Sequence, residues 1–417
     1  MTVKVGPGFP SAGCEWSEIV AMLDAARCND LPWRSGRTTR AAFFVSAELE
    51  ERSREAFDMF FGENALLMSR FPSLIRFEAE LIAMTLDLLA ASNDADGIFT
   101  SGGTESIFLA CLAAREAFRN THGDAVEPEI VVPFSAHPAF DKAAFYLRMR
   151  VKRVELTGEY RADISAMEKA VGKATAMLVG SAPCWPHGTI DPIDELSALA
   201  QRGGHWLHVD ACMGGFLLPF YKDAGYPAAP HLLSGGIRSV SVDFHKYAHS
   251  AKGASAVLFA SRADRARAAF QFSGWSGSNY TTSGFLGTRT GGALASAWAI
   301  TRHLGTEGYV ELVRTVMELR DRLVSHIESI PELELLGQPV SPLLSFRGRS
   351  VPTGSIAAGL EKRGWIVTRI LNPDAIHVIL NPVHGPTMAA YLADLSASVA
   401  DAAAGASPVA SGDVGYS

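Results

Sequence analysis

The chain has 417 residues, of which 48% are hydrophobic and 19% charged, so it can bury a large core in two domains or in one large domain with an appendage. The net charge of −7 and the lack of any block rich in lysine and arginine argue against a nucleic-acid partner. The five cysteines are widely spaced and form no C-x-x-C pair, which argues against a disulfide framework and a structural zinc site.

The hydropathy of the sequence argues against membrane insertion. No apolar run reaches the roughly 18 residues that a membrane-spanning helix needs. The first residues, MTVKVGPGFPSAG, lack the apolar core of a signal peptide. Together with the cysteine pattern, this predicts a cytoplasmic protein without a membrane span and without a metal site.

Two amphipathic stretches come first in the chain. Residues 46–61 and 73–90 each begin with a serine suited to cap a helix and place apolar residues at helical spacing. Between about residues 97 and 260, helical patterns then alternate with short apolar runs: GIFT, EIVVP, RVKRVEL, TAMLVGSA, HWLHVDA, RSVSVD and ASAVLFA. Such alternation predicts an α/β fold with a mostly parallel, seven-stranded sheet and with ligands beyond the carboxyl ends of its strands.

A different pattern follows this core. A long helical pattern over residues 306–330 precedes the apolar runs ELELLG, PLLSFR, GWIVTRI and AIHVIL, with helical stretches between and after them. This predicts a smaller α+β C-terminal domain. The predicted organisation is an N-terminal arm over 1–60, a large domain over 61–305, the small domain over 306–401 and a flexible tail over 402–417.

The first strand of the core runs directly into a glycine-rich turn and a helix. In GIFTSGGTESIFLACLAAR, residues 97–115, free backbone N–H groups and the helix dipole face one point, and Gly102 and Gly103 let an anion approach the backbone. The segment is neither a G-x-G-x-x-G nor a P-loop motif. It is either a phosphate-binding cup or a plain strand-to-helix turn with a Ser/Thr cap.

Two later strands end in groups that would complete a cofactor site. Asp210 closes the run HWLHVD, and Lys246 follows the run RSVSVD; Asp210 alone could be an ordinary turn residue. Pyridoxal 5'-phosphate needs a phosphate anchor, an acid beside its pyridine nitrogen and an amine for a Schiff base, and each occurs here in order. We expect burial to lower the pKa of Lys246, and His245 and Tyr247 to offer polar groups near the phosphate.

These motifs resemble a known family. The stretches FPSLIRFEAELIAM, TSGGTESIFLACLAARE, SAHPAFDKAAFYL, GSAPCWPHGTIDPI, HVDACMGGF, VDFHKYAHSAKGASAVL and SGFLGTRTGG are similar to those of fold-type I pyridoxal-phosphate enzymes, the aspartate-aminotransferase fold. Within that fold, the chain resembles sphingosine-1-phosphate lyases and the related group II decarboxylases. The resemblance covers about residues 40–300, and it implies that the large domain binds the cofactor.

The resemblance also implies roles for single residues. It makes Lys246 the Schiff-base lysine, Asp210 the partner of the pyridine nitrogen, and His137 a catalytic residue that stacks on the cofactor ring. From the residues alone, His137 could instead cap a helix. The implied cofactor-binding set is Ser101, Gly102, Gly103, Thr104, His137, Asp210, His245, Lys246 and Ser283.

Four further residues are implied to bind the substrate, a small amine or amino acid. They are Asn64, His187, Lys252 and Tyr280. His187 lies in a Pro/Gly-rich loop, where it is either a surface histidine or part of the floor of the site. Lys252 is either a solvated turn lysine or, as in the family, a substrate-binding one, which favours the lyase branch.

A loop rich in hydroxyls and glycine, YTTSGFLGTRT, covers residues 280–290. It is either a flexible polar loop or, as the resemblance implies, a loop that reaches the cofactor phosphate of a neighbouring subunit. The second alternative predicts a homodimer with active sites at its interface. Arg289 would then structure this loop or meet an anion.

The resemblance implies a carbon–carbon lyase that breaks Cα–Cβ of an amino alcohol or related amine to an aldehyde and a smaller amine. The alternatives are an amino-acid decarboxylase and a non-catalytic cofactor-binding protein. In the lyases, a tyrosine stands in a G-A-x-Y context and a histidine shortly before F-P-x-L; this chain has Phe44 and Leu67 there. Neither residue offers a proton or a hydrogen bond, so we expect a substrate other than sphingosine phosphate itself.

Overall fold

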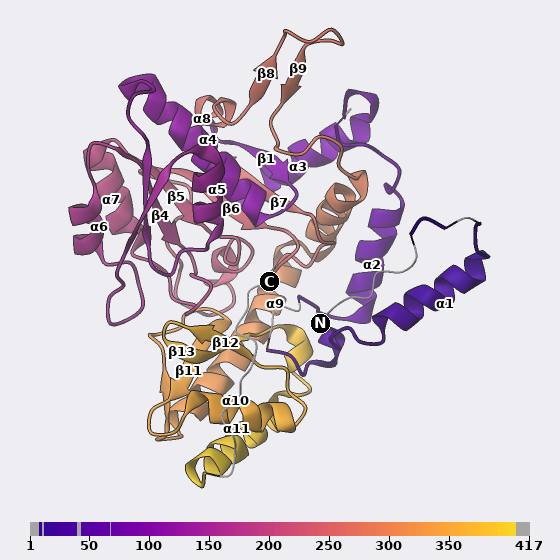
Figure 1. The fold of residues 1–417 in the computed structure, drawn as a ribbon, viewed down its shortest axis with the longest axis vertical. Coiled ribbons are helices and arrows are strands. Elements are labelled where there is room, and N and C mark those ends of the chain that lie inside the picture. The colour runs from indigo at the N-terminus through magenta and orange to yellow at the C-terminus, as the bar shows by residue number, and fades with distance from the viewer. Residues whose placement is uncertain (1–7, 11, 40–42, 67, 406–417) are drawn as a thin grey trace.

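The computed structural model of the chain describes residues 8–10, 12–39, 43–66 and 68–405 (Figure 1). The predicted tail lies outside the described residues from 406 onward, as does Leu67. The arm is described from residue 8 and contains two helices, α1 (Trp16–Arg27) and α2 (Ala47–Asp58). In the part of the chain that is described, no helix has the length and apolar character to cross a membrane.

A seven-stranded sheet forms the centre of the large domain. Its strands lie in the order β1-β7-β6-β5-β4-β2-β3. All are parallel except β7, which pairs antiparallel with both of its neighbours. The bounds are β1 (Asp96–Thr100), β2 (Glu129–Pro133), β3 (Arg150–Val154), β4 (Thr175–Ser181), β5 (Trp206–Asp210), β6 (Ile237–Asp243) and β7 (Ser255–Phe259). The predicted fold class is therefore confirmed.

Helices cover both faces of this sheet, as the buried side chains show. On one face, alternate strand residues such as Val132 and Val179 pack against α4 (Gly103–His122) and α5 (Ala139–Leu147). On the other, Val131 and Leu178 belong to a core shared with further helices. These are α3 (Pro72–Leu88), α6 (Ile164–Ala170), α7 (Ile193–Gly203) and the first part of α9 (Gly291–Glu328). Because both faces are buried, inner strands such as β2 and β4 are mostly apolar, whereas the edge strand β3 carries Arg150, Lys152 and Arg153.

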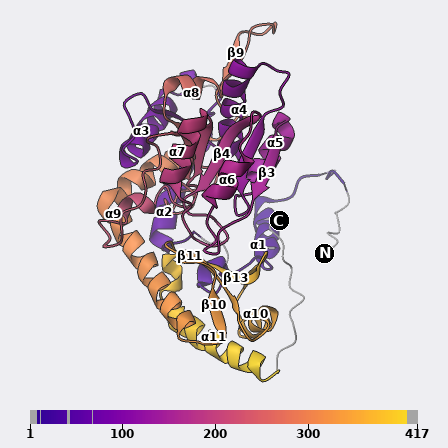
Figure 2. The same cartoon turned by 90° about the vertical axis from the view of Figure 1, so that its left-hand side faces the viewer.

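A second sheet forms the small domain. Its four strands are antiparallel, in the order β10 (Leu333–Leu335), β11 (Leu343–Gly348), β13 (Asp374–Ile379) and β12 (Thr368–Leu371). They share a separate core with α10 (Thr353–Lys362), α11 (Met388–Ala403) and the last turns of α9. Figure 2 shows α9 running from the large domain down to this unit. Gly305 (φ 55°, ψ −170°) interrupts α9 between its two parts.

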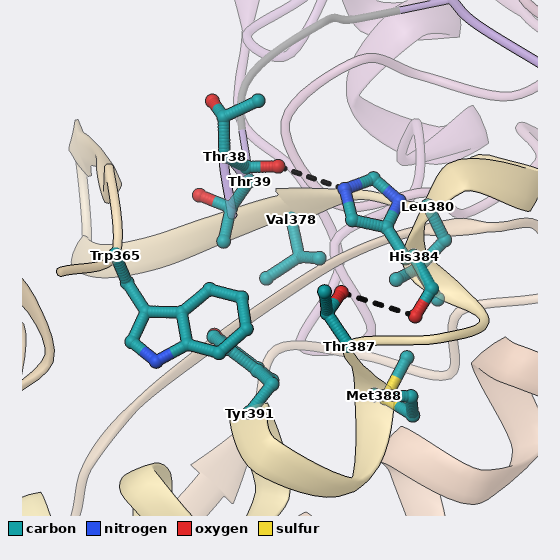
Figure 3. A pocket seen from close by; sticks show the side chains of 9 residues that line it. All are labelled: Thr38, Thr39, Trp365, Val378, Leu380, His384, Thr387, Met388 and Tyr391. Atoms are coloured by element: carbon teal, nitrogen blue, oxygen red, sulfur yellow. Dashed lines mark hydrogen bonds between the residues drawn. The ribbon is translucent and has the colours of Figure 1, made fainter. Parts of the chain in front are cut away.

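The N-terminal arm is fastened to the small domain. Figure 3 shows His384, which donates from Nε2 to the carbonyl oxygen of Thr38 at 2.8 Å. Thr387 Oγ1 donates to the carbonyl oxygen of Gly36 at 2.7 Å. The pocket drawn there has a volume of about 10 Å³, the size of one water molecule, and it borders the hydroxyl of Tyr391, which finds no hydrogen-bond partner among the described residues. It is a packing junction rather than a ligand site.

Candidate active site

A cavity of about 1070 Å³ opens where the parallel strands of the large sheet end. Both carboxylates at the ends of β5 and β6, Asp210 and Asp243, line it. The segment 368–372 of the small domain closes the opposite side. The cavity therefore lies between the two sheets, at the edge where the sequence predicts ligands.

The segment Ser101–Thr104 lines this cavity at the start of α4. A side chain at Gly103 is excluded, because a Cβ atom there would lie 2.7 Å from the sulfur of Cys212 and 3.1 Å from Asp243 Oδ1. Since the first amides of a helix have no partner within it, the segment can receive an anion.

Sequence reasoning missed a residue that shapes this cup, Glu105. Its Oε2 accepts hydrogen bonds from the amide and hydroxyl of Ser101, at 2.7 and 2.6 Å. Its Oε1 accepts the amide of Phe285 at 2.8 Å. Glu105 therefore joins the cup to the hydroxyl-rich loop 280–290. Glu105 stands two residues after Gly103 in the first turn of α4, and this position could have predicted a contact with the start of the helix.

Asp210 presents one oxygen to the protein. Its Oδ1 accepts the amide of Cys212 at 3.1 Å and the hydroxyl of Ser241 at 3.2 Å. Burial would raise the pKa of Asp210, but its interactions with His137, Lys246 and Cys212 outweigh this effect, so the pKa is lowered. The carboxylate stays ionised and can hold a cationic nitrogen.

His137 lines the cavity at the start of α5. Its Nδ1 accepts the amide of Ala139 at 3.1 Å, and burial lowers its pKa, so the ring is neutral at pH 7. Arg153, which the sequence reasoning missed, holds the preceding loop by donating to the carbonyl oxygens of Phe134 and Ala136, both at 3.0 Å. The structure thus brings a flat neutral ring to the same cavity as Asp210.

The Lys246 side chain lines the cavity but is paired. Its Nζ lies 2.8 Å from Oδ2 of Asp243, whose side chain is 1% exposed. Burial by itself would lower the pKa of Lys246, but the negative charge of Asp243 raises it well above its usual value. The expectation of a lowered pKa was therefore wrong, because Asp243 was not considered. In the sequence, Asp243 ends the strand β6 three residues before Lys246, and this spacing could have predicted the ion pair.

The two neighbours of Lys246 face different ways. His245 lines the cavity and its Nδ1 donates to the carbonyl oxygen of Ala254 at 2.7 Å. The hydroxyl of Tyr247 instead donates to the carbonyl oxygen of Leu380 at 2.9 Å. The tyrosine is buried and joins the large domain to the small one, so its expected place near a phosphate was wrong.

Lys252 lines the cavity, and its Nζ donates to the carbonyl oxygen of His245 at 3.1 Å. Among the described residues, no carboxylate forms an ion pair with it, and burial lowers its pKa. The ring of Phe43 lies 5.8 Å from Nζ. Phe43, not Phe44, lines the cavity; Phe44 packs against Trp33, with ring centroids 5.7 Å apart.

Four sequence-predicted residues lie outside the cavity wall that the described residues form. His187 is buried, with its ring 4.6 Å from that of Tyr160, and burial lowers its pKa to about 4. It is not a surface histidine. Asn64 forms an isolated bridge with Thr290. Tyr280 starts β9 (Tyr280–Thr282) and Ser283 follows it; β9 and β8 (Phe270–Phe272) form a hairpin that projects from the large domain (Figure 1).

Two residues of the small domain reach the cavity without any signal in the sequence. Arg369 on β12 lines it and pairs with Asp374. His377 on β13 lines it with its ring 4.2 Å from that of Trp185. They lie more than 120 residues beyond Lys246 in the chain, and only the packing of the two domains brings them close.

Comparisons with known proteins show the family and the fold of this chain. The profile of the pyridoxal-dependent decarboxylase conserved domain matches residues 58–349. A sphingosine-1-phosphate lyase of Arabidopsis thaliana is 35% identical over 95% of this chain and 74% of its own. The solved structure of a Burkholderia pseudomallei sphingosine-1-phosphate lyase is 33% identical, with a TM-score of 0.91 over 96% of this chain and 94% of its own. Lactobacillus brevis glutamate decarboxylase, 18% identical with a TM-score of 0.83 over 95% of each chain, shares the fold.

Proposed function

The chain belongs to the pyridoxal-dependent decarboxylase family and is a pyridoxal-phosphate-dependent lyase, and within this class we propose that it cleaves the Cα–Cβ bond of an amino alcohol that carries an anionic group. The products are an aldehyde and a smaller amine. The observation that carries the proposal is Lys252, a cavity-lining ammonium group without an ion-pair partner among the described carboxylates.

The side chains around the cavity fit the cofactor. Ser101–Thr104 would hold its phosphate, because this segment lines the cavity at the start of α4, where the first amides of the helix have no partner within it. The second oxygen of Asp210 would hold the pyridine nitrogen, His137 would lie against the ring, and Lys246 would carry the cofactor covalently. When bound, pyridoxal phosphate supplies an electron sink for the bond that breaks.

The substrate end of the cavity suits a molecule with an anionic end and apolar parts. Lys252 would receive the anion, while Phe43, Phe134 and Ile370 offer apolar walls. Anchoring one end of a substrate limits how its reacting carbon can lie, and so selects which bond at that carbon is broken. Lys252 thus selects both substrate and bond.

We propose that two copies of the chain form a homodimer. Exposed apolar side chains gather on α1 and on the β8–β9 hairpin; they include Trp16, 73% exposed, and Trp275, 57% exposed. Surfaces of this kind are usually covered by a partner. In a dimer, Ser283 and Tyr280 would serve the cavity of the neighbouring copy, which explains why they lie outside their own. Sedimentation of the protein at several concentrations tests this, and a monomer would contradict it.

Two further expectations remain proposals. The proposed domains are the arm over 1–60, the large domain over 61–305 and the small domain over 306–401; the kink at Gly305 supports a boundary within α9, and the side chains of α9 join the small-domain core from Leu319 onward. All five cysteines are free thiols, which supports a reducing, cytoplasmic location.

One substrate panel tests the proposed reaction. It contains sphinganine phosphate, unphosphorylated β-hydroxy amines, and aromatic and acidic amino acids, with aldehyde and carbon dioxide measured separately. We expect aldehyde release from amino alcohols, faster with an anionic group than without. Carbon dioxide release alone would establish the decarboxylase alternative. Cofactor binding without turnover of any compound would establish the non-catalytic one.

A further inference from the structure

Asp243 is a buried carboxylate with two partners that point to a proton-handling role. Its Oδ2 lies 2.8 Å from Nζ of Lys246, and its Oδ1 accepts the hydroxyl of Ser255 at 2.6 Å. The register of β6 against β7 places Asp243 directly opposite Ser255, so the strand pairing holds the carboxylate in position. Lys246 keeps 24% of its side chain exposed toward the cavity.

The remaining groups around Lys246 do not offer an equivalent contact. Asp210, at the end of β5, makes its hydrogen bonds to Cys212 and Ser241. His245, in the same turn, lies 3.8 Å from Asp243. The other titratable groups near Lys246 and the carboxylates Asp210 and Asp243 are the neutral ring of His137, the thiol of Cys212 and the ammonium group of Lys252, which opposes a positive charge on Lys246.

We propose that Asp243 is the proton partner of Lys246: it holds the free amine as an ammonium ion and accepts its proton when the amine bonds to the cofactor. The proposal rests on the proposed function, since it assumes that Lys246 is the cofactor lysine. Because Asp243 contacts the reacting nitrogen, it acts directly on the chemistry of the site.

The step balances in protons. The proton moves from Nζ to Oδ2, and the neutral nitrogen bonds to the aldehyde carbon of pyridoxal phosphate. One hydrogen of the amine and the proton held by Asp243 then leave with the aldehyde oxygen as water. The nitrogen keeps one hydrogen and the positive charge, and Asp243 is again a carboxylate. When a substrate amine later frees Lys246, the carboxylate stabilises the lysine as an ammonium ion that can return a proton to the substrate.

The test measures the protonation of Lys246 without any turnover. Full-length protein freed of cofactor is labelled with trace acetic anhydride between pH 6 and 11, and the acetylation of Lys246 is followed by mass spectrometry. In the wild type, we expect labelling only at the most alkaline values. In Asp243→Asn, loss of a negative charge in direct contact should lower the midpoint by roughly 1 to 3 pH units.

Two variants separate this role from a structural one. Asp210→Asn removes a carboxylate at the neighbouring strand end, and we expect a smaller shift because no hydrogen bond joins it to Lys246. Ser255→Ala keeps the charge of Asp243 but removes the hydrogen bond from Ser255, so it should shift the labelling midpoint of Lys246 by less than Asp243→Asn does. If Asp243→Asn does not fold, Ser255→Ala serves as the test. Rebinding of cofactor at a lower pH in Asp243→Asn would agree with the proposal.

A midpoint that is unchanged in Asp243→Asn, or shifted at least as much in Asp210→Asn, would overturn the proposal. Because no substrate is present, this result is independent of the substrate panel. A protein that proved to be a decarboxylase could still show the Asp243 shift, and a lyase could lack it.

Discussion

The two oxygens of Asp210 have separate tasks, which makes Asp210→Asn a clean perturbation. Both hydrogen bonds from the protein, from the Cys212 amide and the Ser241 hydroxyl, go to Oδ1. An asparagine can keep both bonds with its amide oxygen. Its NH2 group then stands where Oδ2 was, and it donates where the pyridinium nitrogen of the cofactor needs an acceptor. We expect the fold to survive and the contact with the cofactor to be lost.

The loss of one charge-assisted hydrogen bond costs about 1.5 to 3 kcal/mol, which is roughly a 10- to 150-fold weaker cofactor affinity. Most lyase activity should disappear as well, because a neutral amide cannot keep the nitrogen protonated. Absorbance titration with pyridoxal phosphate and an aldehyde assay measure the two effects. Ser241→Ala is the matched control: it removes a hydrogen bond to Oδ1 but leaves the charge, so its affinity should fall by no more than about tenfold. Near-normal turnover in Asp210→Asn would show that the partner of the nitrogen lies elsewhere.

Three further predictions follow from the site. Borohydride reduction of the holoenzyme should fix the pyridoxyl mass on the peptide of Lys246; label on Lys252 or Lys142 would contradict the assignment. Lys252→Met should raise KM for an anionic amino alcohol by roughly tenfold or more while changing KM for the uncharged analogue little, and equal effects on both would refute its role as an anion anchor. Burial lowers the pKa of His187 from its usual 6.5 to about 4, so the unfolded chain binds more protons between these values. The free energy of unfolding should therefore fall as the pH falls from 6.5 to 4, by up to about 3 kcal/mol from this residue; denaturant titrations should show a shallower fall in His187→Gln.

Much of the site could be predicted because its parts are local in the chain. A strand followed by SGGT and a helix forms an anion cup wherever it lies, since the free amides come from the helix start itself. Asp210 and Lys246 follow apolar runs, and parallel strands bring such ends to one edge of a sheet. The sequence therefore determined the fold class and the edge of the sheet at which the cavity opens, and it predicted the three groups that we propose hold the pyridoxal cofactor.

Only the tertiary structure decided what these groups contact. Asp243 was visible in the sequence, but its ion pair with Lys246 depends on how the two side chains are oriented after the strand β6. This contact raises the pKa of Lys246, whereas burial alone would lower it. Phe43 faces the cavity and Phe44 packs against Trp33. The segment is neither helix nor strand, so no periodic pattern of apolar residues could show which of the two neighbours faces the cavity. Arg369 lines the cavity from the small domain. The sequence could not show this, because the packing of the two domains depends on the shapes of their cores rather than on any local pattern of residues.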